Sequence, residues 1–176
     1  MINDITAHFY KKLYIDNSVI SGKGLFTSER IQKGERILSF GGILALQSDR
    51  GNPHFIPSTY AGLTENIIIC ESTESEKDYS DYINHSCEPN IGMEDCLTII
   101  AINDIAIGEE LLCDYSFWEA DEKWVLKQPC NCGKNKCRKR ITGMDWKRIS
   151  PNDPSFNYYS PFLQRKIVIN SLLEVR

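Results

Sequence analysis

Short apolar runs separated by turn residues dominate the first 115 residues of the chain. Seven of these runs are predicted to be extended: Leu13–Asp16, Leu25–Thr27, Arg36–Phe40, Ile43–Leu46, Asn66–Cys70, Leu97–Ile102 and Glu109–Asp114. Glycine, proline and asparagine punctuate them, and strands this short are typical of small twisted sheets. The pattern therefore predicts a mostly β protein.

A helical period is weak until the last part of the chain. Phe162–Val175 favours a helix, although Ile167-Val168-Ile169 leaves a strand open as the alternative. Residues 47–63 are predicted to form a loop, and residues 116–129 link the strand region to a group of cysteines.

The length of 176 residues suits one domain, or one domain with a small appendage. Hydrophobic residues make up 41% and charged residues 25%, which argues against disorder, collagen and coiled coil. The apolar runs are too short to cross a bilayer, and the first residues, Met1–Asp4, do not resemble a secretion signal. We therefore expect an intracellular protein, in cytoplasm or nucleus, without membrane association.

Charge divides unevenly along the chain. Residues 1–126 hold 9 Lys and Arg against 21 Asp and Glu, whereas residues 127–176 hold 11 against 3. An acidic body favours a basic partner. The alternative is a solvated acidic face on which the basic C-terminal part docks. The same two interpretations apply to the acidic stretch Glu71–Asp81.

Three of the seven cysteines lie within eight residues: Cys130, Cys132 and Cys137. An odd number without a secretion signal argues against a disulfide framework, and clustered intracellular thiols are typical of metal ligands. A tetrahedral zinc site needs a fourth ligand from elsewhere. The candidates are the three histidines and Cys70, Cys87, Cys96 and Cys113. The other interpretation is a set of free buried thiols.

Three further motifs are weak when taken singly. Ser21-Gly22-Lys23-Gly24-Leu25-Phe26 offers two glycines where backbone can approach a ligand closely, but it is neither a phosphate loop nor a dinucleotide-binding turn. Asn84–Asn90 reads N-H-S-C-E-P-N and could be a tight turn, and Glu110–Tyr115 reads E-L-L-C-D-Y and could be an edge strand.

Together, the order and spacing of these motifs resemble the SET domain, a family of protein lysine methyltransferases. The resemblance covers residues 12–143. Five segments carry it: the G-x-G at 22–24, Phe40-Gly41-Gly42 in place of Y-x-G, N-H-S-C-x-P-N at 84–90, E-L-x-x-D-Y at 110–115, and the post-SET C-x-C-x₄-C at 130–137.

The resemblance implies a SET-domain β-clip type fold. Such a fold has small twisted sheets and a pseudo-knot in which the N-H-S-C and E-L-x-x-D-Y segments thread past each other, which is rare in proteins generally. A zinc-binding post-SET lobe and a short C-terminal helix complete it. We expect a SET domain over 1–116, the linker and post-SET lobe over 117–143, and a C-terminal extension over 144–176.

The resemblance also implies that the chain transfers methyl groups from S-adenosylmethionine to a lysine nitrogen. Tyr115 becomes the catalytic residue. The cofactor contacts carried over are Lys23, Gly24, Phe26, Tyr82, Asn84, His85 and Ile141; the lysine channel is carried over to Phe40, Cys113 and Tyr115. Cys87 is implied as the fourth zinc ligand beside Cys130, Cys132 and Cys137.

Three positions depart from the family pattern. Phe40 replaces a usual tyrosine, Cys113 replaces a usual aromatic residue, and Asp81 replaces a usual arginine. A roomier lysine channel would favour di- or trimethyl product. The acidic body favours a basic protein substrate, such as a histone, and nucleic acid is not required. The rival hypothesis is a catalytically silent SET module that binds peptide or nucleic acid; the intact Tyr115 and N-H-S-C motif favour the enzyme.

Overall fold

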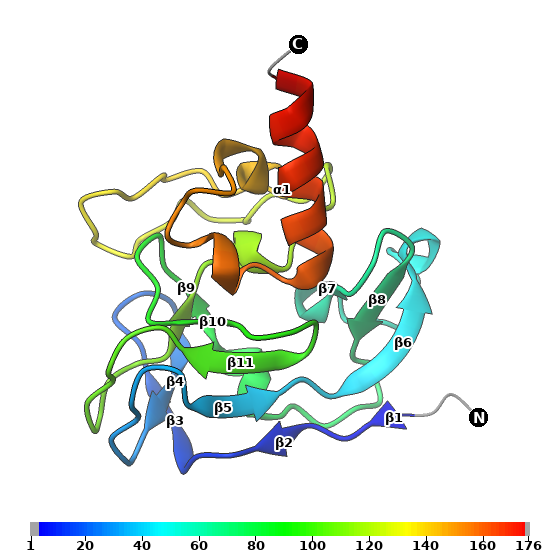
Figure 1. The fold of residues 1–176 in the computed structure, drawn as a ribbon. Coiled ribbons are helices and arrows are strands. Elements are labelled where there is room, and N and C mark those ends of the chain that lie inside the picture. Colours follow the sequence, from blue (N-terminus) through cyan, green and yellow to red (C-terminus); the bar gives the residue numbers. More distant parts are fainter. Residues whose placement is uncertain (1–3, 175–176) are drawn as a thin grey trace.

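Twelve short β-strands and one α-helix form the part of the chain that this computed structural model describes, residues 4–174. The strands make three small sheets, as the turn-rich pattern of the first 115 residues predicts (Figure 1). Five of them span only two residues, so pairing with neighbouring segments, rather than their own sequence, defines them as strands.

The first sheet has four antiparallel strands in the order β1–β6–β8–β7. These are β1 (Asp4–Ile5), β6 (Gly42–Leu46), β8 (Ile67–Cys70) and β7 (Ala61–Gly62). A separate two-stranded hairpin pairs β3 (Leu13–Asn17) with β4 (Lys23–Thr27), which places the Gly22 turn at its tip.

The second sheet has six strands in the order β2–β5–β11–β10–β12–β9. They are β2 (His8–Phe9), β5 (Arg36–Ser39), β11 (Thr98–Ala101), β10 (Ile91–Met93), β12 (Leu112–Cys113) and β9 (Asn84–His85). The β-branched and leucine side chains of β5 and β11 are mostly fully buried, which explains why they form its centre.

The N-H-S-C segment and the E-L-x-x-D-Y segment cross each other in a knot-like arrangement. Strand β12 lies between β9 and β10 and runs parallel to both, although β9 and β10 are consecutive in the chain. The backbone N–H groups of Ser86 and Asn90, in the connection between them, donate to the carbonyls of Cys113 and Leu112. The E-L-x-x-D-Y segment therefore threads past the N-H-S-C segment, as expected.

The predicted strand Glu109–Asp114 is shorter in the structure. Only Leu112 and Cys113 belong to the six-stranded sheet, because the preceding residues pair with β4 instead. Glu110 forms an isolated bridge with Phe26, and the N–H of Leu111 donates to the carbonyl of Leu25. The segment changes partners between residues 111 and 112.

The C-terminal segment is helical, and α1 spans Pro161–Glu174. Proline suits the first helical position because that N–H needs no partner. Phe162, Leu163 and Ile167 enter the same core cluster as the central strands, whereas Leu172 and Leu173 are exposed near the end that projects from the body (Figure 1). None of the helices within residues 4–174 is long and apolar enough to cross a membrane.

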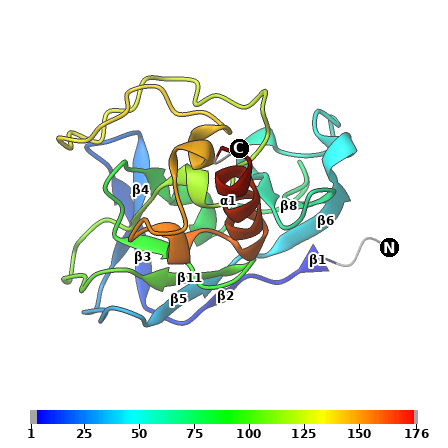
Figure 2. The same cartoon turned by 45° about the horizontal axis from the view of Figure 1, so that its top comes forward.

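Residues 117–143 form a long loop on the same side of the sheets as α1 (Figure 2). Cys130, Cys132 and Ile141 make a small core there, separate from the main one. Basic groups of the C-terminal half bind acids of the body: Arg138 binds Asp114 and Lys166 binds Glu65. These ion pairs attach part of the basic C-terminal segment to the acidic body. Residues of the acidic stretch Glu71–Asp81 also line a cavity.

Candidate active site and cysteine cluster

A cavity of about 970 Å³ opens between the four-stranded sheet and the residues that follow β12. Its lining includes the aromatic residues Phe40, Tyr60, Tyr115, Trp118 and Trp124. A cavity of this size that combines aromatic walls with a few polar groups is the usual form of a binding site.

Tyr115 is held at this cavity by two segments of the fold. It opens the 3₁₀ turn η4 (Tyr115–Phe117) directly after β12. Its hydroxyl donates to the carbonyl of Ile83 at 2.8 Å, and its backbone N–H donates to His85 Nδ1 at 3.2 Å. Burial raises the pKa of Tyr115 well above its ordinary value, so the phenol stays protonated.

Two tryptophan rings lie near the Tyr115 ring, and one of them also lies near Phe40. The ring centroid of Trp118 lies 5.7 Å from Tyr115 and 5.5 Å from Phe40, and Trp124 lies 6.2 Å from Tyr115. Aromatic faces attract ammonium groups and exclude water. The two tryptophans are absent from the sequence-derived site, because they stand in a linker that has no recognisable pattern.

The expected lysine-channel residues separate in the structure. Phe40 and Tyr115 line the cavity, whereas Cys113 is fully buried in the main core behind Tyr115. Its thiol points back toward the carbonyl of Asp114 at 3.7 Å.

A clamp holds the glycine turn against the N-H-S-C motif. The side-chain amide of Asn84 donates to the carbonyls of Ser21 and Lys23 at 3.2 and 3.0 Å, and to Glu110 Oε1 at 2.8 Å. A Cβ at Gly24 would overlap that same carboxylate oxygen, so a larger residue there would displace the Glu110 carboxylate from Asn84.

Four of the seven expected cofactor residues therefore gather around β9. Lys23 and Gly24 meet Asn84 through the clamp, and His85 follows in the same strand. Tyr82 lies in the 3₁₀ turn η3 (Tyr79–Tyr82), which packs against β4. Phe26 stacks on Tyr14 at 5.6 Å, and Ile141 lies in the core of the cysteine lobe.

Acidic side chains form another part of the cavity wall. Glu71, Asp81, Glu119 and Asp121 belong to the lining. Arg50 neutralises two of them, with contacts of 3.1 Å to Glu119 and 3.5 Å to Asp121. Burial raises the pKa of Asp81, whose carboxylate also accepts from the backbone of Asp78. Lys123 and Lys127 also belong to the lining, so the acidic part of the wall is confined to Glu71 and Asp81.

The thiols of Cys87, Cys130, Cys132 and Cys137 lie within 4.8 Å of one another, and two of them, Cys87 and Cys130, are 4.0 Å apart. A tetrahedral zinc site with bonds of about 2.3 Å needs sulfurs roughly 3.8 Å apart. The donor set and its spacing thus fit zinc. Of the fourth-ligand candidates, the fold brings Cys87 to the other three.

Neighbouring groups favour the thiolate at Cys132, whereas burial raises the pKa of Cys87 to about 11 and raises that of Cys130 further. Burial by itself raises the pKa of Cys132, but hydrogen bonds from the backbone of Cys87 and Lys134 and from adjacent thiols lower it to about 6. The backbone N–H of Arg138 donates to Cys87 Sγ at 3.3 Å. Such donors around a metal ligand fix its position and offset its charge.

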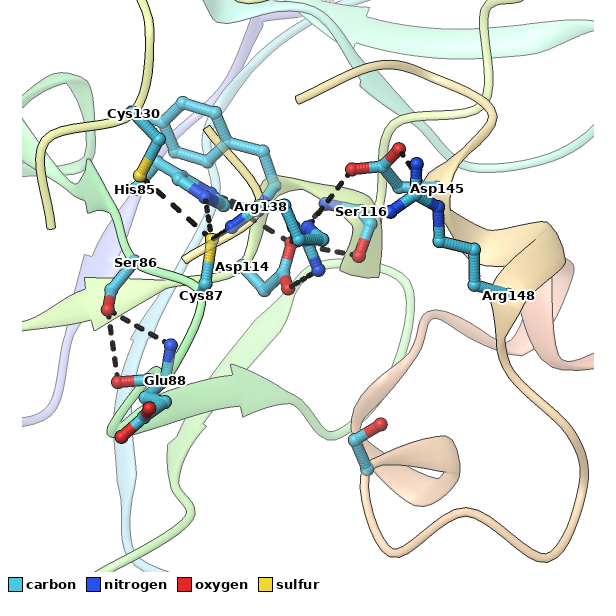
Figure 3. A network of polar contacts seen from close by, with 12 residues as sticks. His85, Ser86, Cys87, Glu88, Asp114, Ser116, Cys130, Arg138, Asp145 and Arg148 are labelled. Carbon is cyan, nitrogen blue, oxygen red and sulfur yellow. Dashed lines mark hydrogen bonds and ion pairs between the residues drawn. The ribbon is translucent and has the colours of Figure 1, made fainter. Parts of the chain in front are cut away.

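His85 connects the cluster to Tyr115. Its Nδ1 accepts from the Tyr115 N–H, so the neutral ring carries its proton on Nε2, which lies 3.4 Å from Cys87 Sγ. Burial is the main reason that its pKa falls to about 4, which keeps the ring neutral beside Asp114. A single imidazole therefore contacts both the cysteine cluster and the catalytic candidate. Figure 3 shows the contact of His85 with Cys87.

The sequence is similar to known proteins over this region. The family described as "SET domain" matches residues 22–116. The H3 lysine-4 specific histone-lysine N-methyltransferase of Cryptococcus neoformans is 32% identical over 73% of this chain, and putative histone-lysine N-methyltransferase 1 of Plasmodium falciparum is 35% identical over 74%. The chain spans 10% and 2% of the lengths of those two proteins.

A solved structure has a similar fold. KRYPTONITE, in a crystal structure in complex with mCHG DNA and SAH, superposes with a TM-score of 0.56 over 75% of this chain and 29% of that chain. The sequences are 24% identical in the comparison, so this likeness concerns the fold.

Proposed function

This chain belongs to the SET-domain family, and from that premise we propose that it transfers methyl groups from S-adenosylmethionine to lysine side chains of a basic protein. The proposal extends to the implied zinc ion, held by four cysteines. The relatives named above are histone-lysine N-methyltransferases, which supports a histone as one substrate class and the nucleus as one location.

The observation that carries the proposal is the placement of Tyr115. Its hydroxyl donates its proton to the Ile83 carbonyl at 2.8 Å while the ring lines the cavity. The oxygen therefore keeps its lone pairs for a group in the cavity. A fixed dipole of this kind stabilises positive charge and orients a reacting nitrogen without reorganisation during the reaction.

The glycine turn and β9 supply groups that fit the cofactor. No atom lies within 4 Å of the position that a Cβ would take at Gly22, which has a φ of +50°, so the space beside the turn is open, while the turn's own carbonyls accept hydrogen bonds from Asn84 and Ser18. We assign Lys23, Gly24, Phe26, Tyr82, Asn84, His85 and Ile141 to its binding. When bound, S-adenosylmethionine supplies a methyl group on a sulfonium centre, which an amine can accept by in-line displacement.

The aromatic walls would prepare the acceptor. The amine must lose its proton before it can attack, and a free lysine has a pKa of about 10.4. Phe40, Tyr115 and Trp118 surround the space with apolar surface, and desolvation disfavours the ammonium form. The same rings hold the aliphatic part of the lysine in line.

The acidic wall supports a basic substrate. Glu71 and Asp81 face the cavity from segments that the aromatic rings do not occupy. Opposite charge on a peptide would be attracted to them and would orient the chain beside the target lysine. The four cysteine thiols would hold zinc in a structural role, because a site with four protein ligands leaves no open position for substrate.

A methyl-transfer assay tests the proposal. The full chain is incubated with tritiated S-adenosylmethionine and, separately, with core histones, a mixture of basic ribosomal proteins, and serum albumin as the non-basic control. We expect label on lysines of the basic proteins, identified by mass spectrometry. Binding of a histone peptide without label on any of the proteins would instead favour the silent peptide-binding module.

A further inference from the structure

Arg138 joins the cysteine cluster to the turn that carries Tyr115 (Figure 3). It follows Cys137 directly, and its own N–H donates to Cys87 Sγ. Its guanidinium extends from the cysteine lobe to Asp114 and binds both carboxylate oxygens in a fork, with Nη1–Oδ2 and Nη2–Oδ1 distances of 2.6 and 2.7 Å. Parallel bonds of this kind fix both distance and orientation.

The surroundings make this contact costly to lose. Asp114 is 4% exposed and Asp145 is 2% exposed, and Arg138 Nε lies 3.1 Å from Asp145 Oδ2. One cation therefore serves two buried carboxylates. Breaking a buried pair by removing one partner strands a charge in a low-dielectric interior.

Asp114 in turn organises the catalytic turn. Its carboxylate accepts from the backbone N–H of Ser116 at 3.0 Å and from the Ser116 hydroxyl at 2.8 Å, which caps η4. Tyr115 is the residue between the two. Burial alone would raise the pKa of Asp114, but the Arg138 fork lowers it overall, so the carboxylate is charged while it accepts these bonds.

We propose that Arg138 is a positioning residue for Tyr115, by which the folded cysteine lobe fixes the catalytic turn through Asp114. The expected effect on catalysis rests on the proposed function, whereas the expected effect on the structure of η4 does not. Without the fork, the Asp114 carboxylate that caps η4 is no longer held in place, and the Tyr115 ring loses its fixed alignment even where the glycine turn is intact. The lobe would then be required for turnover beyond any direct contact with cofactor.

Arg148 provides a matched control. Its Nε lies 3.9 Å from Asp145 Oδ1, but its side chain is 64% exposed and it does not touch Asp114. Arg138→Gln and Arg148→Gln therefore each remove one positive charge near the same aspartate. The fork onto Asp114 is lost in the first variant and kept in the second.

The test combines metal content, SAH affinity, turnover and amide hydrogen exchange on the full chain. For Arg138→Gln we expect zinc content and SAH affinity within about twofold of wild type, kcat lowered by about 10-fold or more, and KM for a histone peptide within about threefold. Amide exchange at residues 115–117 should rise at least about 10-fold. Arg148→Gln should match wild type in every measurement.

Two additional variants make the route explicit. Arg138→Lys keeps the charge but lacks the fork, so we expect an intermediate loss, and it serves if Arg138→Gln does not fold. Adding Asp114→Asn to Arg138→Gln should lower kcat no further than Asp114→Asn alone, because both act through one contact. If the losses in kcat multiply in the double variant, or if amide exchange at residues 115–117 in Arg138→Gln equals that of wild type, the inference is overturned.

The exchange measurement also separates this inference from the proposed function. Faster exchange at residues 115–117 in Arg138→Gln would support the positioning role even if the wild type transfers no methyl group. Chelation of zinc should raise exchange at the same residues in wild type but add little in Arg138→Gln. An equal rise in both proteins would contradict a route through Arg138.

Discussion

The hydroxyl of Tyr115 and the carbonyl of Ile83 are 2.8 Å apart, and this bond joins the two segments that thread past each other. Tyr115 follows β12 and Ile83 precedes β9, and the two strands pair in parallel. The phenol proton is therefore directed at backbone, and the oxygen's acceptor side is left for the cavity. The crossing of these two segments fixes the position of the Tyr115 hydroxyl, although the strands that form it are short.

The protonated state of Tyr115 gives a first prediction. Burial raises its pKa, so the phenol stays neutral through its ordinary titration range near pH 10. Turnover should rise with pH as the substrate lysine loses its proton, with no falling limb below about pH 10. A pH profile of kcat, with SAH affinity measured at each pH as a control, checks this. A descending limb centred near pH 9 at unchanged SAH affinity would argue against it.

Metal removal gives a second prediction. Purified protein should contain about one zinc per chain, held by Cys87, Cys130, Cys132 and Cys137, with Zn–S distances of about 2.3 Å. Cys130→Ser should unfold the cysteine lobe and leave the strand body folded, because the core formed by Cys130, Cys132 and Ile141 is separate from the main one. Cys96→Ser, outside the cluster, is the control. Protein purified without chelator and found free of zinc would contradict the assignment.

The glycine turn gives a third prediction. Gly24→Ala places a methyl group 2.2 Å from Glu110 Oε1, which Asn84 and Ser18 hold by hydrogen bonds. The clamp must then open, so SAH affinity measured by calorimetry should fall by about 10-fold or more. Gly24→Ala combined with Glu110→Ala should bind no more weakly than Glu110→Ala alone. Additive losses would show that the steric contact is not the cause.

The degree of methylation gives a fourth prediction. Phe40 lines the cavity and brings no hydroxyl to its wall, so the wild type should form di- or trimethyl-lysine. Phe40→Tyr adds one hydroxyl without changing the ring and should shift the product toward monomethyl-lysine. Mass spectrometry of the product peptide measures this, with Phe156→Tyr in the C-terminal segment as the control. A wild type that stops at monomethyl-lysine would refute the size argument.

Local sequence patterns were sufficient to predict the longer strands and the clustered thiols of the metal site. The β-branched run that becomes β8 and the apolar run that becomes β6 are recognisable because each has several apolar residues between turn residues. Asn84 and Tyr115 stand in motifs with fixed spacing, so their positions follow from the order of residues. The spacing of Cys130, Cys132 and Cys137 indicates a metal site in the same way.

Other features depend on distant contacts and have no local signal. The two-residue strands β9 and β7 are too short for alternation, and they exist because β12 and β8 offer hydrogen-bonding edges. Trp118 and Trp124 follow no period: the turn η4 brings Trp118 to Tyr115, and the return of the linker over the cavity brings Trp124 there. Cys113 alternates with Tyr115 in sequence, but the chain leaves the strand at Asp114 and turns; Cys113 is buried in the main core, whereas Tyr115 lines the cavity.

The most direct test of the account compares wild type with Tyr115→Phe. The change removes one oxygen and keeps the ring, so SAH affinity by calorimetry should stay within about threefold. Single-turnover methyl transfer to a histone peptide should fall by about 100-fold or more, since the hydroxyl acts in the transition state. Equal transfer rates in the two proteins, with equal SAH affinity, would contradict the catalytic role of Tyr115.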